Sequence, residues 1–181
     1  MTYFRKAHPS KNRQHGVALI TGLIFLVVLT LIAVTAARMA GLEERMSGNM
    51  RDRSLAVQAA EMALRDAERD IRTRVSGITN FVSACTNGLC YNGPAGNSNG
   101  TNWNTTPVWT LVSLTAAPSV AYGQFTGAGG IAGISAQPRY IVEGMRKTQP
   151  GGGVVFYYRI TARAQGGNPN TVVWLQEVFR P

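Results

Sequence analysis

Val17 to Ala37 form an uninterrupted run of 21 residues without a charged side chain, VALITGLIFLVVLTLIAVTAA. A helix of about 20 apolar residues spans the hydrocarbon core of a bilayer. Basic residues precede the run and predict a cytoplasmic N-terminus, because membrane segments keep their positive flank on the cytoplasmic side. Arg38 on the far side weakens this contrast without reversing it. We therefore expect one membrane-inserted segment, with the rest of the chain beyond the membrane.

Three topologies are compatible with this run. A conventional secretory signal would be cut at a small-residue site, and Val34-Thr35-Ala36 is an acceptable one. An uncleaved signal anchor would keep the whole chain. In the third topology a basic leader, residues 1–16, is removed by a cut after Gly16. Composition alone favours the first two, so the residues that flank the run must decide.

The charged residues argue against an enzyme. The net charge is +9, but part of it lies in residues 1–16, so it is poor evidence for a nucleic-acid partner. Both histidines, His8 and His15, also lie in residues 1–16, and the C-terminal half has only two carboxylates, Glu143 and Glu177. A His-based triad, a zinc site or a paired-carboxylate hydrolase needs more than this. We expect no catalytic site, no metal and no cofactor.

The helix is expected to continue through Arg74. The segment lacks proline and is rich in Ala, Leu, Met, Glu and Arg, which favour helices. Apolar residues recur at three- and four-residue spacing and form one stripe: Ala56, Ala60, Ala63, Ala67 and Ile71, with Leu64 and Val75 beside them. Charged pairs such as Glu61/Arg65, Asp66/Asp70 and Arg65/Arg69 are assigned to the other faces. Gly41 and Gly48 are the expected weak points.

The C-terminal half predicts a small β-rich head. Strand-like segments are Val108 to Leu114, Tyr140 to Met145, Val154 to Ala164 and Thr171 to Phe179. The last three most simply form an antiparallel meander, whose hydrophobic face covers the alanine stripe. The expected fold class is therefore α+β, a long N-terminal helix packed on a small antiparallel sheet.

Residues 85–107 have the composition of a loop, rich in Asn, Gly, Thr and Pro. Cys85 and Cys90 are the only cysteines, and outside the cytoplasm they are expected to form a disulfide that closes a small loop. The stretch 92–105 is either an ordinary solvated loop or a surface that binds a partner. Composition does not separate these alternatives.

Several motifs resemble one family. Gly16 at the end of a basic leader, LEERMSGNMRDR at 42–53 and AVQAAEMALRDAE at 56–68 closely resemble the N-terminal region of PilX-type minor pilins of type IV pili. The stretches PRYIVEG, YYRITARAQGG and NTVVWLQEVFR resemble the C-terminal strands of the same family. Residues 76–137 show no such resemblance.

The resemblance implies a pilin-like fold and life cycle. Prepilin peptidase would cut after Gly16 and methylate the new amino terminus of Val17. Residues 17–37 would be the transmembrane and assembly half of the helix, residues 38–75 its amphipathic second half, and residues 76–181 the head. The implied partners are other minor pilins, the major pilin, the peptidase, the inner-membrane assembly platform and lipid. The implied roles are initiation of pilus assembly, twitching motility and adhesion.

Thr21 departs from the general pilin pattern. Major pilins resemble one another in carrying Glu at the fifth mature position, which is Thr21 here. A charge in the hydrocarbon core costs on the order of 2.5–3.5 kcal/mol, and threonine avoids this cost but cannot neutralise a neighbour's amino terminus. The hypothesis is a tip-proximal place in the pilus. The alternative is a merely tolerated polar residue.

Two further binding hypotheses concern the head. One is a tip adhesin that uses the 92–105 stretch. The other is a weak DNA-binding face near Tyr157 and Trp174, formed by Arg139, Arg146, Lys147, Arg159, Arg163 and Arg180. For these basic residues the more ordinary interpretation is a solvated sheet surface.

Overall fold

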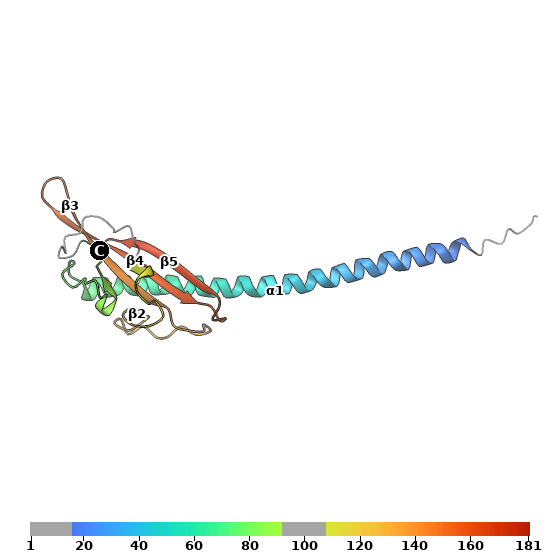
Figure 1. The fold of residues 1–181 in the computed structure, drawn as a ribbon, viewed down its shortest axis with the longest axis horizontal. Coiled ribbons are helices and arrows are strands. Elements are labelled where there is room, and N and C mark those ends of the chain that lie inside the picture. Colours follow the sequence, from blue (N-terminus) through green and yellow to red (C-terminus); the bar gives the residue numbers. More distant parts are fainter. Residues whose placement is uncertain (1–15, 92–107) are drawn as a thin grey trace, which may run out of the picture. The chain divides into compact units, whose positions relative to one another are not determined.

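The computed structural model describes residues 16–91 and 108–181 and has the expected α+β fold (Figure 1). The elements are α1 (Val17–Arg74), the 3-10 helix η1 (Thr86–Gly88), β1 (Leu89–Cys90), the 3-10 helix η2 (Val108–Thr110), β2 (Val120–Ala121), β3 (Arg139–Thr148), β4 (Val154–Gln165) and β5 (Val172–Phe179). The chain divides into two units, one up to Ser47 and one from Gly48 onward. Each unit is described by itself below.

Helix α1 comprises 58 residues. Gly41 and Gly48, the expected weak points, both lie within it. Strong helix formers surround each glycine, and their summed propensity outweighs about 1 kcal/mol of cost for each glycine. The predicted extent of the helix, to Arg74, is confirmed.

Strands β3, β4 and β5 form the predicted antiparallel meander. Tyr140 of β3 lies opposite Ala162 of β4, and Ala162 lies opposite Leu175 of β5. Two very short strands, which the sequence did not predict, also pair with β3: β1 runs parallel to it and β2 antiparallel. The predicted strand from Val108 to Leu114 is wrong. This stretch begins with η2 and continues in turns, and Val108 and Leu114 are buried without joining the sheet.

The main core lies between the second half of α1 and one face of the sheet. Ala63, Ala67 and Ile71 of the helix pack with buried residues of β3 and β4: Tyr140, Val142, Tyr158, Ile160 and Ala162. Alanine has a small side chain, so the helix backbone approaches the sheet closely and leaves room for the two tyrosines. The predicted stripe is confirmed, and Ala59 also belongs to it.

Asp66 and Asp70 correct the predicted faces of the helix. The sequence places them on the faces away from the apolar stripe, but their exposed fractions are only 2% and 0%. Each lies within three or four residues of Ala63 and Ala67, so helical geometry places them beside the stripe. Buried carboxylates must be paired or hydrogen-bonded, and both of these are.

A smaller core covers the opposite face of the sheet. Ile141 of β3 points to this face, and buried Cys85, Cys90, Val108 and Leu114 pack against it. The disulfide loop and the stretch from Val108 to Leu114 therefore cover the outer side of β3. Both faces of the central strand are shielded, which explains why its residues 140–143 are all buried.

Candidate assembly site

The expected cleavage point lies at the very start of α1. The helix begins at Val17, and the Ile20 amide donates a hydrogen bond to the Gly16 carbonyl oxygen at 3.4 Å. Gly16 and Val17 are both exposed. The rest of the expected leader, residues 1–15, lies outside the described residues. The peptide bond between Gly16 and Val17, the expected cleavage point, therefore lies directly before the first turn of the helix.

The apolar half of α1 has an unpartnered surface within the part of the chain that the structure describes. Every residue from Val17 to Ala37 is exposed, and the large side chains are at least 46% exposed. The helix is long and apolar enough to cross a membrane. A surface of this kind is stable only when lipid or other apolar helices cover it.

Three threonines interrupt this surface, and each one satisfies its hydroxyl within the helix. The Thr21 hydroxyl lies 2.9 Å from the carbonyl oxygen of Val17 and 3.1 Å from that of Ala18. Thr30 donates to the Val27 carbonyl, and Thr35 to the carbonyls of Leu31 and Ile32. A hydroxyl bonded to its own helix costs little in an apolar environment, where water is absent. The surface of residues 17–37 is therefore almost entirely apolar.

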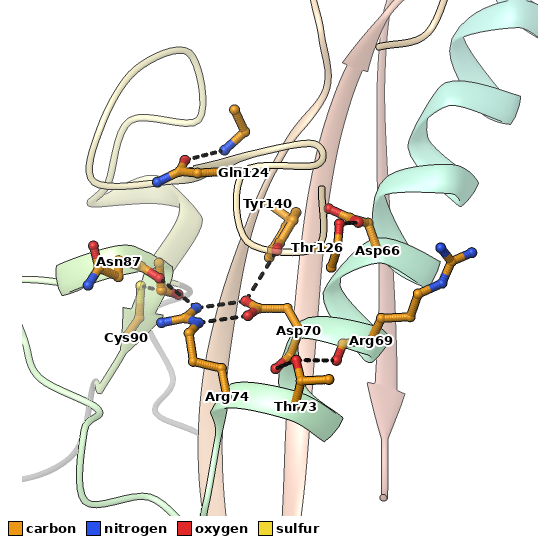
Figure 2. A network of polar contacts seen from close by, with 12 residues as sticks. Asp66, Arg69, Asp70, Thr73, Arg74, Asn87, Cys90, Gln124, Thr126 and Tyr140 are labelled. Carbon is orange, nitrogen blue, oxygen red and sulfur yellow. Dashed lines mark hydrogen bonds and ion pairs between the residues drawn. The ribbon is translucent and has the colours of Figure 1, made fainter. Parts of the chain in front are cut away.

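The C-terminal end of α1 carries a polar network around Asp70 (Figure 2). The Arg74 guanidinium donates two hydrogen bonds to the Asp70 carboxylate, both 2.6 Å long. The Tyr140 hydroxyl donates to the same carboxylate at 3.2 Å. The hydrogen bond to Asp70 raises the pKa of Arg74. Burial, followed by the charge of Asp70, raises the pKa of the Tyr140 phenol, which stays protonated and keeps donating.

Arg74 links this network to two neighbouring segments. Its guanidinium donates to the Asn87 carbonyl oxygen at 3.3 Å and lies 3.9 Å from the centre of the Phe125 ring. Asn87 is in η1, inside the loop that the Cys85–Cys90 disulfide closes. One arginine thus connects the helix, the disulfide loop and the segment that follows β2.

Asp66 holds that last segment from the other side. Its carboxylate accepts a hydrogen bond from the Gly123 amide at 2.8 Å and another from the Thr126 hydroxyl. Gly123 has a φ of +76°, and a Cβ there would collide with the Ala128 carbonyl oxygen. Only glycine fits this turn. The glycine-rich stretch around it is a clamped turn of the head.

Asp52 forms a third link, between α1 and the β4–β5 hairpin. Its carboxylate accepts a hydrogen bond from the Asn168 amide at 3.1 Å. A hydrogen bond from Thr171, followed by the one from Asn168, lowers the pKa of Asp52. A Cβ on Gly166 would come within 2.6 Å of the same carboxylate. The hairpin turn therefore reaches the helix closely only because glycine occupies that position.

Sequence reasoning missed all three of these aspartates as contact-forming residues. Asp70 and Arg74 stand four residues apart, an arrangement that favours an ion pair on a helix, and this was the available signal. The partners of Asp52 and Asp66 lie 116 and about 60 residues away in the sequence. No local pattern could have indicated them.

The basic residues of the sheet do not form one face. In the strand register Arg139, Arg163 and Trp174 lie side by side on the outer face, whereas Arg146 lies opposite Phe156 on the face of α1. Arg159 is paired with Glu143 through two hydrogen bonds of 2.8 and 2.6 Å. Arg139 donates to the hydroxyl and the carbonyl of Ser119. Two of the expected DNA-binding cations are thus engaged within the head, and the stretch 92–105 lies outside the described residues.

Comparison with protein families gives two matches. A family model described as type IV pilus assembly protein PilX C-term matches residues 86–181, and one described as PilX N-terminal matches residues 15–65. Neither the search of curated proteins nor that of solved structures gave a match. The two family matches cover both the start of α1 and all three long strands.

Proposed function

Because the chain belongs to the PilX family of type IV pilus assembly proteins, we propose that it is a minor pilin, a structural subunit rather than a catalyst. The observation that carries this proposal is the contrast within α1. Its first half exposes an apolar surface with internally satisfied hydroxyls, and its second half supports a folded head. A subunit of this kind fits a fibre in which neighbouring apolar helices cover one another.

The proposed maturation begins with a cut between Gly16 and Val17. Prepilin peptidase removes residues 1–16 and methylates the amino group of Val17. The position of Gly16 immediately before the first helical turn supports this proposal, because the cut then leaves α1 whole. Before assembly the mature subunit is stored in the inner membrane, with its N-terminus towards the cytoplasm and its head in the periplasm.

The proposed partners follow from this life cycle. The apolar half of α1 contacts lipid first, and then the helices of the major pilin and of other minor pilins. The assembly platform in the inner membrane moves the subunit from one environment to the other. The assembled subunit supports initiation of assembly, twitching motility and adhesion.

Adhesion is assigned to residues 92–105. Deletion of 92–105 is expected to preserve pilus number and to reduce adhesion.

Thr21 supports a tip-proximal place. Threonine carries no charge, and its hydroxyl is already bonded to the carbonyls of Val17 and Ala18, so it cannot neutralise a neighbour's amino terminus. A subunit at the tip has no neighbour ahead of it and needs no such charge. A Thr21→Glu variant is expected to assemble away from the tip, as immunogold labelling of sheared pili would reveal. Unchanged tip labelling of this variant would contradict the tip hypothesis.

The first test of the whole proposal is the intact mass and N-terminal sequence of the protein from membranes that contain prepilin peptidase. The expected product begins at Val17 and carries one added methyl group. A Gly16→Leu variant, which keeps the basic flank and the apolar run, is expected to retain its leader. A product that begins near Ala37, or an uncut wild-type chain, would contradict the pilin proposal.

A further inference from the structure

The outer face of the sheet carries a small hollow beside the edge strand β5. Its lining comes from three elements and consists of Trp109, Thr161, Trp174, Leu175 and Gln176. Its volume is about 160 Å³, close to the roughly 150 Å³ that accommodates a single benzene ring. Trp174 is 45% exposed, although a large aromatic side chain usually finds cover. The hollow is thus the size of one ring and is walled by two indoles.

Two of the residues that line the hollow are polar. Thr161 and Gln176 lie opposite each other in the β4–β5 register, and the Gln176 amide donates to the Thr161 hydroxyl oxygen at 2.9 Å. This bond orients the amide. Thr161 itself is only 3% exposed, whereas Gln176 keeps its carbonyl oxygen and a second amide hydrogen for a ligand. An oriented amide that lines the same hollow as two indoles is the arrangement of a binding site rather than of a core.

The charges at the hollow favour a neutral ligand. No charged side chain is among the described residues that line the hollow. The Arg159 guanidinium lies 5.7 Å from the Trp109 ring centre, but its charge is balanced by Glu143. Arg139, farther along the same face, is held by Ser119. Arg163 lies opposite Trp174 in the strand register but does not line the hollow. Binding of single-stranded nucleic acid requires a track of free cations along the phosphate backbone as well as stacking, and Arg159 and Arg139 are already engaged.

We propose that this hollow binds one ring of a neutral saccharide. A pyranose with equatorial hydroxyls has two apolar C–H faces and a rim of hydroxyls. The faces match the indoles of Trp109 and Trp174, and the rim matches the donor and the acceptor of the Gln176 amide. Tryptophan combines a large apolar surface with little conformational freedom to lose, and this makes it an effective wall for such a ring. The head of the subunit would then recognise a sugar on a surface.

The test uses the full chain in a detergent that has no sugar head group, with cellotriose as the probe. Binding is measured by saturation-transfer difference NMR, in which magnetisation passes from the protein to the C–H protons of the bound sugar. A titration with the sugar gives the dissociation constant. We expect saturable binding that is weakened about tenfold or more by Trp174→Ala. Gln176→Ala, which leaves both indoles in place, is expected to weaken binding as well.

Val178→Ala is the matched control. Val178 lies on the same face of β5 and is 59% exposed, but it does not line the hollow, so its loss is expected to leave binding unchanged. An equal effect of Val178→Ala and Trp174→Ala would overturn the proposal. So would an absence of saturable sugar binding, or a response only to a thymidine oligonucleotide that disappears with salt. This assay involves neither leader cleavage nor a pilus, so it is independent of the proposed assembly role.

Discussion

The two halves of α1 belong to one helix but obey different rules. From Val17 to Ala37 the side chains are apolar and exposed, and within the described residues nothing packs on them. From Ala56 to Ile71 the buried side chains are mainly alanines packed against a sheet. The first half depends on surroundings that another molecule supplies. The second half finds its partners in the same chain, so its stability can be measured on this protein alone.

The polar groups show the same difference. The threonines of the first half donate to carbonyls three or four residues away. Besides the local bonds from Arg74 to Asp70, the aspartates of the second half accept hydrogen bonds from residues 57 to 116 positions away in the sequence. Local bonds keep the helix intact in any environment, whereas distant bonds fix the helix to the head. Substitutions in the two halves should therefore have separable effects.

The largest expected effect is that of Asp70→Ala. This change leaves Arg74 without its carboxylate partner and Tyr140 without its acceptor, at the centre of the network in Figure 2. Removal of one member of a buried ion pair costs about 3 kcal/mol. We expect a loss of this size in the free energy of unfolding of the head, measured by urea titration with near-UV circular dichroism.

Glu61→Ala is the control for this comparison. Glu61 is an exposed carboxylate on the same helix and is absent from the network, so a change within about 0.5 kcal/mol is expected. Equal losses in the two variants would mean that Asp70 stabilises the head no more than a surface carboxylate does.

The next effect concerns packing rather than charge. Ala63 has no exposed surface and lies between α1 and the sheet, so Ala63→Leu inserts three carbons where there is no room. Overpacking of this kind costs about 2 kcal/mol. Ala33→Leu adds the same atoms to the exposed half and is expected to leave unfolding of the head unchanged. A comparable loss from Ala33→Leu would show that the two halves are energetically coupled.

Asp52→Asn should act on one hairpin. The Asp52 carboxylate accepts from Asn168, and its pKa is lowered by the bonds from Thr171 and Asn168. Because the pKa is lowered in the folded state, the ionised Asp52 carboxylate stabilises the fold above the unfolded pKa. This stabilisation is lost as the pH falls through the folded pKa. The variant should flatten the acid side of the stability profile and accelerate hydrogen exchange at the Asn168 amide. Unchanged exchange would show that the bond to Asp52 is dispensable.

The sequence predicted the regular elements well, because each has a period of its own. Alanines at three- and four-residue spacing identified the buried face of α1, and alternation identified β4. The failures have physical reasons. Val108 and Leu114 are apolar because they cover Ile141 from outside the sheet, and a short apolar run looks the same in either role. Strands β1 and β2 have two residues each, too few for any period.

The polar contacts were harder to predict than the elements. Asp66 and Asp70 are like charges four residues apart, a spacing that is unfavourable on an isolated helix. In the fold each carboxylate has its own donors, Gly123 and Thr126 for one and Arg74 and Tyr140 for the other. The hollow lined by Trp109 and Trp174 was also not predictable from local patterns, since η2 and β5 are far apart in the sequence. Long-range pairing decides both features.

The smallest expected effect is a gain. Glu177 of β5 faces α1, and burial, followed by the charge and hydrogen bond of Glu68, raises its pKa above the ordinary value of 4.5. Because the pKa is raised in the folded state, the protonated Glu177 carboxyl stabilises the fold below the unfolded pKa. This stabilisation is lost as the pH rises through the folded pKa. Glu177→Gln should therefore raise the melting temperature near neutral pH, by about 3 °C at most, and the gain should vanish in acid. Glu68→Gln should produce a similar gain by removing the like charge that repels Glu177, whereas Glu61→Gln should not. A gain that is equal at all pH values would instead indicate a packing effect. The charge of Glu177 beside the second half of α1 would then have no measurable effect on stability.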